Sequence, residues 1–155
     1  MTDLHEILSP DAVLEHVSAG TRKALFQQLA TTAAKAYALD PAVVTNAVAT
    51  REKLGSTGFG AGVATPHGKV PGLTRVCGVF ARLTNPLDFA AVDDLPVDIV
   101  FMLLSPPDAG ADHLKALARV SRTLRDKSFV AKLRGAGSRD ALVALLTADQ
   151  VRDAA

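Results

Sequence analysis

The feature that most constrains this chain is a concentration of glycine near its middle. Six of the eleven glycines fall between Gly55 and Gly72, and each glycine costs a helix about 1 kcal/mol relative to alanine. We therefore expect no helix over this stretch. The one regular element expected here is a brief strand over residues 63–65 that leads into a tight Pro66-His67-Gly68 turn.

Local signals predict helices on both sides of the glycine-rich stretch. Thr21 and Asp40 are side-chain acceptors that cap two helices, and a proline follows Asp40 at a position that needs no amide hydrogen. In the last third of the chain, Asp112, Ser128 and Ser138 are the candidate caps of a helix, a short helical turn and a final helix.

Three further segments are predicted strands. Residues 12–17 form a short strand. Residues 74–83 alternate in side-chain polarity, and Pro86 ends this second strand. Residues 97–104 become continuously apolar, as expected of a strand covered on both faces. Helices around a few strands are typical of an α/β or α+β protein. We expect an α/β fold: a single three-layer domain whose mixed β-sheet is flanked by helices on both faces.

Length and composition fit one domain. The chain has 155 residues, and we treat 1–155 as one unit with a structured core over about 5–148 and a flexible C-terminus. Apolar residues at 48% and charged residues at 21% exclude a largely disordered chain. A net charge of +1 gives no electrostatic footprint for nucleic acid or an anionic membrane surface.

Cysteine content and the N-terminus point to the cytoplasm. Cys77 is the single cysteine, which excludes a disulfide framework and a cysteine-ligated zinc site. The first residues carry acids where a signal peptide has a basic region. No run approaches the ~20 apolar residues of a spanning helix, so we expect no direct membrane insertion.

The common glycine-rich and metal motifs do not fit. Residues 58–62 lack the GxGxxG spacing and follow a helix instead of a strand, and no GxxxxGK[ST] motif occurs. Residues 55–58 are not a GxSxG elbow. The four histidines show no ligand spacing. We therefore expect neither a metal nor a cofactor.

The remaining chemical candidate is His67. Proline before it and glycine after it would present the imidazole at the surface in a fixed pose. The tripeptide alone favours an ordinary loop histidine, so its wider context decides the interpretation.

That context is similar to a known family. The segments REKLGSTG at 51–58 and GVATPHGK at 62–69 resemble the phosphoacceptor signature of the enzyme IIA proteins of the sugar phosphotransferase system. The likeness extends over nearly the whole chain. It is strongest to the fructose/mannitol type and, within that type, to the nitrogen-regulatory subgroup.

The resemblance implies a role for three residues. His67 matches the histidine that is phosphorylated, on Nε2, with Nδ1–H anchored. His113 matches the second active-site histidine and Arg51 the arginine near the phosphoryl group. Thr65 departs from the branched aliphatic residue usual before the proline, and its hydroxyl has either a phosphate-binding or a structural role.

The chemistry of these side chains supports the same roles. Imidazole, with a pKa of about 6.5, is both a nucleophile and a leaving group near neutral pH. A backbone carbonyl is the simplest group to hold its second nitrogen. Arg51 can donate a fork of hydrogen bonds to a phosphoryl group, and amides of Gly58, Gly60 and Gly68 could add an anion-binding nest.

The neighbouring polar residues are more ambiguous. We interpret Ser56 and Thr57 as turn formers. Lys69 either attracts the phosphate or an acidic partner, or is a plain surface charge. Phe59 is expected to be an exposed part of a partner surface around His67.

Three functions remain open. The first is a histidine phosphocarrier that takes a phosphoryl group from an HPr-like protein, or its nitrogen-branch relative, and regulates target proteins by its phosphorylation state. The second is a sugar-transport IIA that passes the phosphate to a separate IIB component. The third is a binding module of the same fold that is not phosphorylated.

Overall fold

A mixed sheet organises residues 4–148, the part of the chain that the computed structural model describes. The expectation of a flexible C-terminus falls on residues beyond 148, outside the described residues. In sheet order the strands run β1-β5-β6-β3-β2, with β4 also paired to β6. They are β1 (Leu8–Val17), β2 (Gly58–Gly60), β3 (Val63–Ala64), β4 (His67–Lys69), β5 (Cys77–Leu87) and β6 (Val97–Ser105).

The strand directions make the sheet mixed, as predicted. β1 is parallel to β5, and both β3 and β4 are parallel to β6. The pairs β5–β6 and β2–β3 are antiparallel. Residues 99–104 of β6 are fully buried, so the continuously apolar segment is indeed the central strand.

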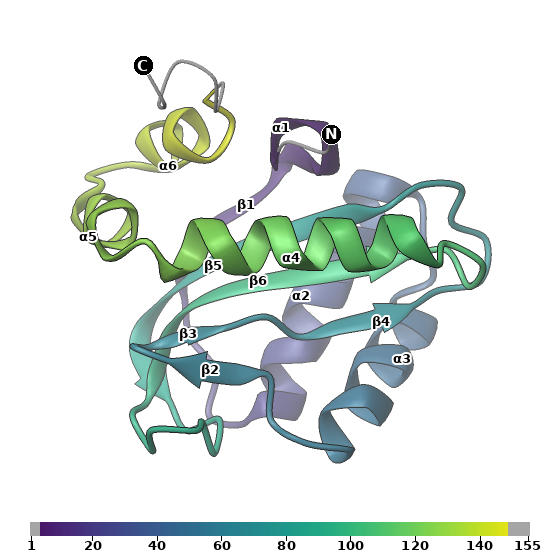
Figure 1. Cartoon of the computed structure of the whole chain (residues 1–155), viewed down its shortest axis with the longest axis horizontal. Helices are drawn as coiled ribbons and strands as arrows, with labels where there is room; N and C mark the ends of the chain where they lie inside the picture. Colours follow the sequence, from purple (N-terminus) through teal and green to yellow (C-terminus); the bar gives the residue numbers. More distant parts are fainter. Residues whose placement is uncertain (1–3, 149–155) are drawn as a thin grey trace.

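Helices lie on both faces of this sheet, which confirms the three-layer α/β fold (Figure 1). α2 and α3 pack together behind the sheet as drawn, and α4 crosses its front face. The helices are α1 (Leu4–Ile7), α2 (Arg22–Tyr37), α3 (Pro41–Lys53), α4 (Ala111–Arg125), α5 (Lys127–Gly135) and α6 (Arg139–Leu146).

Three predicted helix caps are confirmed. Thr21 accepts from the Ala24 amide at 3.1 Å, Asp40 from Ala42 at 2.9 Å, and Ser138 from Ala141 at 3.1 Å. Each side chain satisfies an amide that has no partner within its helix.

The other two predicted caps are wrong. The N-cap of α4 is Gly110, and Asp112 lies in the first turn instead. The α5 helix is capped by Asp126, whose carboxylate accepts from the amides of Ser128 and Phe129. An aspartate two residues earlier reaches both free amides, so Ser128 is left inside the helix.

Several strand boundaries also differ from prediction. β1 begins at Leu8, and β5 continues through Pro86 to Leu87. The pairing of β5 with β6 shifts register between Arg82 and Leu87, and a proline is tolerated in a strand at such an irregularity. The short strands β2 and β4 were not predicted.

The Pro66-His67-Gly68 segment is extended and is not a tight turn. β3 and β4 follow one another along the same edge of β6, and the Leu103 amide donates to the Pro66 carbonyl at 2.9 Å between them. Gly68 lets α3 approach this edge, because a Cβ there would lie 3.0 Å from the Ala47 carbonyl carbon. The imidazole of His67 is therefore carried on the sheet.

Candidate functional site

His67 is the first residue of β4 and is half-buried. Its Nδ1 lies 2.9 Å from the carbonyl oxygen of Thr65. A carbonyl only accepts hydrogen bonds, so the proton of the neutral ring belongs on Nδ1. Nε2 then carries the lone pair.

His113, in the first turn of α4, is packed beside His67. The two ring centroids are 5.5 Å apart, and the ring planes are inclined by 51°. His113 is buried, with an exposed fraction of 9%, and its Nδ1 lies 2.6 Å from the Ser105 hydroxyl. Two histidines well separated in sequence thus meet where β4 and β6 approach the start of α4 (Figure 1).

Burial is the main reason that both imidazoles resist protonation. It lowers the pKa of His67, and the positive charge of Arg51 lowers that pKa further. Burial also lowers the pKa of His113, together with the nearby His67 and Lys69. The Thr65 carbonyl and Glu52 oppose the shift at His67 without reversing it. Both rings are therefore neutral near neutral pH.

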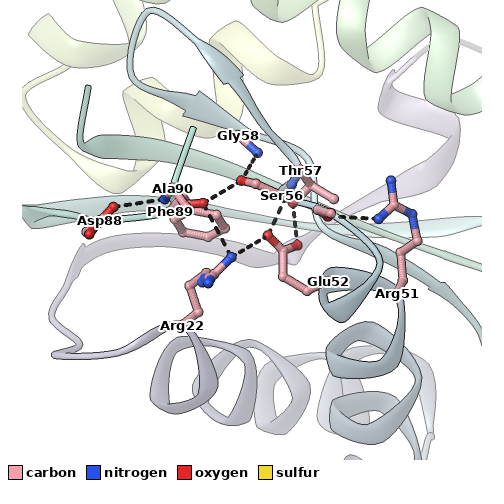
Figure 2. Close-up of polar contacts among 10 residues, drawn as sticks. Arg22, Arg51, Glu52, Ser56, Thr57, Gly58, Asp88, Phe89 and Ala90 are labelled. Atoms are coloured by element: carbon pink, nitrogen blue, oxygen red, sulfur yellow. Dashed lines mark hydrogen bonds and ion pairs between the residues drawn. The ribbon is translucent and has the colours of Figure 1, made fainter. Parts of the chain in front are cut away.

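Arg51 lies in the last turn of α3. Its Nη1 donates to the Gly55 carbonyl at 2.9 Å, which ties the guanidinium to the loop after the helix (Figure 2). Arginine has five N–H donors, so this contact leaves donors available to an anion.

Glu52 is a site-supporting residue that the sequence reasoning missed. Its buried carboxylate accepts from the Thr57 amide at 3.0 Å, from the Thr57 hydroxyl at 2.7 Å and from Arg22 Nη1 at 3.1 Å (Figure 2). The signal available in the sequence is an acid between Arg51 and Lys53, followed at once by a loop rich in hydroxyls.

This carboxylate connects to His67 through the main chain. Glu52 holds Thr57, the Thr57 carbonyl accepts from the Thr65 amide at 3.0 Å, and the Thr65 carbonyl holds His67. The position of the acceptor ring thus depends on the loop after α3. Thr65 positions the His67 ring through its main-chain amide and carbonyl groups.

Ser56 and Thr57, expected as turn formers, instead hold the loop after α3 through side-chain hydrogen bonds. The Ser56 hydroxyl donates to the Phe89 carbonyl and accepts from the Gly58 amide, and Thr57 pairs with Glu52 (Figure 2). The Gly58 amide is thus already engaged, which removes it from the expected anion-binding nest. Lys69 is exposed and close enough to His113 to affect its pKa.

Phe59 was expected to be exposed, but it is partly buried against the core. The Cζ atom of Arg125 lies over its ring, 5.0 Å from the ring centroid.

Among the described residues, no group of three or more histidine, cysteine or acidic side chains could hold a metal ion. Over the same part of the chain, no helix is both long enough and apolar enough to span a bilayer.

Comparison with known proteins decides the family. Residues 6–149 match the family described as phosphoenolpyruvate-dependent sugar phosphotransferase system, EIIA 2. The chain belongs to this family. The Nitrogen regulatory protein of Bradyrhizobium diazoefficiens is 45% identical over 141 residues, which cover 91% of this chain and 92% of that protein.

Solved structures agree with this assignment. The nitrogen regulatory protein IIA-Ntr from Neisseria meningitidis superposes with a TM-score of 0.86 at 35% identity, over 93% of this chain and 99% of that one. Enzyme IIAMTL from Escherichia coli, solved in complex with phosphorylated enzyme IIBMTL, gives a TM-score of 0.74 over 90% and 98% of the two chains. At 20% identity, the second likeness shows the shared fold alone.

This chain is therefore an EIIA protein of the phosphotransferase system with nitrogen regulatory relatives. The structure brings His67 and His113 together and sets the charge of Arg51 near His67. Neither Glu52 nor Ser105 was anticipated.

Proposed function

We propose that this EIIA protein is a histidine phosphocarrier in which Nε2 of His67 accepts a phosphoryl group from a small HPr-like protein or its nitrogen-branch relative. The phosphorylation state then controls which target proteins it binds. The observation that carries this proposal is the contact between His67 Nδ1 and the Thr65 carbonyl at 2.9 Å. It holds one nitrogen and leaves the other as the nucleophile.

The transfer needs no base at the acceptor. The P–N bond of the donor's phosphohistidine breaks, and the donor ring nitrogen keeps the electron pair. The lone pair on Nε2 of His67 forms the new P–N bond, and no proton leaves Nε2. Charge on the equatorial oxygens of the transition state is met by N–H donors from Arg51 and His113, in a half-buried site where such contacts are strong.

The surface around the site suits brief docking of a protein donor. Leu54 and Leu114 are 83% and 66% exposed, and they lie close in sequence to Arg51 and His113 respectively. Exposed leucines beside a charged site provide a small apolar contact of the kind used in transient complexes. We assign docking of the donor protein to the surface that contains these two leucines, in place of a surface that contains Phe59.

A regulatory role is favoured because relatives of this chain are nitrogen regulatory proteins. We place the reaction in the cytoplasm, where the free, buried Cys77 remains reduced. Neither nucleic acid nor a lipid surface is part of the proposal.

The test is phosphorylation with enzyme I, an HPr-type donor and phosphoenolpyruvate. Wild type should gain one acid-labile phosphate per chain, and His67→Ala should gain none. His5→Ala, at an exposed histidine of α1, is the matched control and should behave as wild type. Equal labelling of His67→Ala, or no labelling of wild type, would refute the proposal.

Sugar transport is the second candidate, favoured by 37% identity over 94 residues to the PTS system fructose-specific EIIA component of Haloferax volcanii. Incubating the phosphorylated protein with a cognate IIB component distinguishes the two roles. Rapid transfer to IIB would indicate transport. Binding to target proteins that is unchanged by His67→Ala and His67→Glu would instead support a binding module without phosphotransfer.

A further inference from the structure

Ser105 is a buried hydroxyl next to the proposed site, outside the segments 51–58 and 62–69 that carry the family resemblance. It is the last residue of β6 and is fully buried. Its carbonyl accepts from the Val70 amide at 2.8 Å, and it stands opposite Lys69 in the ladder between β4 and β6. Two prolines follow it. The sheet therefore fixes the backbone from which its Oγ projects.

The hydroxyl has one partner, the ring of His113. The Oγ–Nδ1 distance is 2.6 Å, and among residues 4–148 the Ser105 proton has no other acceptor within hydrogen-bond distance. If Nδ1–H donated to Oγ, the serine proton would be buried without an acceptor, which is costly. If Ser105 donates to Nδ1, that proton is satisfied and the ring proton moves to Nε2.

The groups around His113 make the choice between its two tautomers important for phosphoryl binding. Lys69 and His67 lie near the ring, and the pKa of His113 is lowered by burial and by both neighbours. A neutral imidazole has a single N–H. A lone pair on its second nitrogen would repel phosphoryl oxygens, whereas an N–H there would bind them.

We infer that Ser105 is a positioning residue: its hydroxyl donates to Nδ1 of His113 and so places the ring proton on Nε2, where it can bind a phosphoryl group on His67. This role rests on the proposed phosphocarrier function. The two histidines would then have opposite tautomers, with the proton of His67 on Nδ1 and that of His113 on Nε2. Each tautomer is set by one neighbour, the Thr65 carbonyl or the Ser105 hydroxyl.

Two-bond ¹H–¹⁵N correlation spectra of the unphosphorylated protein at about pH 7.5 test the tautomers directly. In wild type, His113 should show a protonated Nε2 and an unprotonated Nδ1. Ser105→Ala should lose this preference and show averaged nitrogen shifts, and Ser105→Thr should restore it. A wild-type proton on Nδ1 of His113, or an unchanged spectrum in Ser105→Ala, would overturn the inference.

The rate of phosphoryl uptake gives the functional readout. Ser105→Ala should slow uptake on His67 by about tenfold, less than the ~10²–10³-fold expected for removing a transition-state donor itself. Ser105→Thr should recover most of the rate. Ser121→Ala, which removes a hydroxyl from α4 itself about two turns after His113, should leave the rate unchanged. If wild type takes up no phosphate, the phosphocarrier proposal fails, while the spectra still decide what Ser105 does to His113.

Discussion

At the scale of single residues, the site depends on where two ring protons lie and on one guanidinium. His67 has its proton on Nδ1 because a carbonyl faces it, and its other nitrogen is free to react. The resemblance of the segments around residues 51–58 and 62–69 to the enzyme IIA family is what singled out His67, His113 and Arg51. Sequence patterns could not identify Glu52, whose ion-pair partner Arg22 is 30 residues away, or Ser105, which ends an apolar strand.

Arg51→Ala should affect both the rate and the titration of the site. Loss of a donor to the transition state should slow phosphoryl uptake by roughly 10²-fold. The pKa of His67 should rise, because the nearby positive charge that lowers it is gone. Rapid-quench labelling measures the rate, and NMR titration of the ring measures the pKa.

Lys53→Ala is the matched control, since it removes an exposed positive charge from the same helix end. It should change the rate little. A rate equally reduced in both variants would mean that overall charge, and not the placement of Arg51, governs the reaction.

At the scale of elements, the loop after α3 and the short strands place the acceptor ring. Helix starts were predictable at Thr21, Asp40 and Ser138, because each signal lies within three residues of the amide that it caps. The strands β2 and β4 were not, because strands of three residues exist only through their partners. A local pattern cannot show that β6 supplies such a partner.

Glu52→Gln should destabilise the protein by about 2 kcal/mol, because it removes the charge that binds Arg22 and Thr57 in a buried position. Urea denaturation of both proteins measures this loss. Glu6→Gln, at an exposed acid of α1, is the control and should stay within ~0.5 kcal/mol of wild type. Equal midpoints for Glu52→Gln and wild type would contradict the role given to this carboxylate.

Gly68→Ala should loosen the contact between α3 and β4. The added Cβ would lie 3.0 Å from the Ala47 carbonyl carbon and 3.1 Å from the Val48 amide nitrogen, so the helix must shift. We expect a loss of about 1–3 kcal/mol in thermal or urea unfolding. Gly20→Ala meets nothing within 4 Å and should be nearly neutral. Equal stability of the two variants would show that α3 does not pack closely on β4.

At the scale of the whole molecule, a single sheet joins the site to the core. β6 is fully buried through most of its length, pairs with β4 and ends at Ser105. The stability of the core and the geometry of the site therefore depend on the same strand. The three-layer order was predictable because the alternation of helices and strands, and the apolar run of β6, extend over long segments.

Global stability should fall as the pH drops below about 6.5. Both His67 and His113 have lowered pKa values in the folded protein. Below the usual imidazole pKa of about 6.5, these two rings bind protons in the unfolded chain while they are still neutral in the folded protein. The added protons stabilise the unfolded state, so the free energy of unfolding falls. Above pH 7.5 both states are neutral at these rings, and the effect disappears.

Urea unfolding at pH 7.5 and pH 5.5 measures this dependence. The double variant His67→Gln/His113→Gln should flatten it, whereas His5→Gln should keep the wild-type slope. A double variant that retains the full slope would assign the dependence to other groups.

The most direct test of the central claim is the site of the phosphate itself. The ¹⁵N-labelled protein, phosphorylated by enzyme I and an HPr-type donor, should show one-bond ³¹P–¹⁵N coupling to Nε2 of His67, with Nδ1 still protonated against Thr65. A phosphate on Nδ1, on His113 or on a residue other than histidine would contradict the mechanism derived from this site.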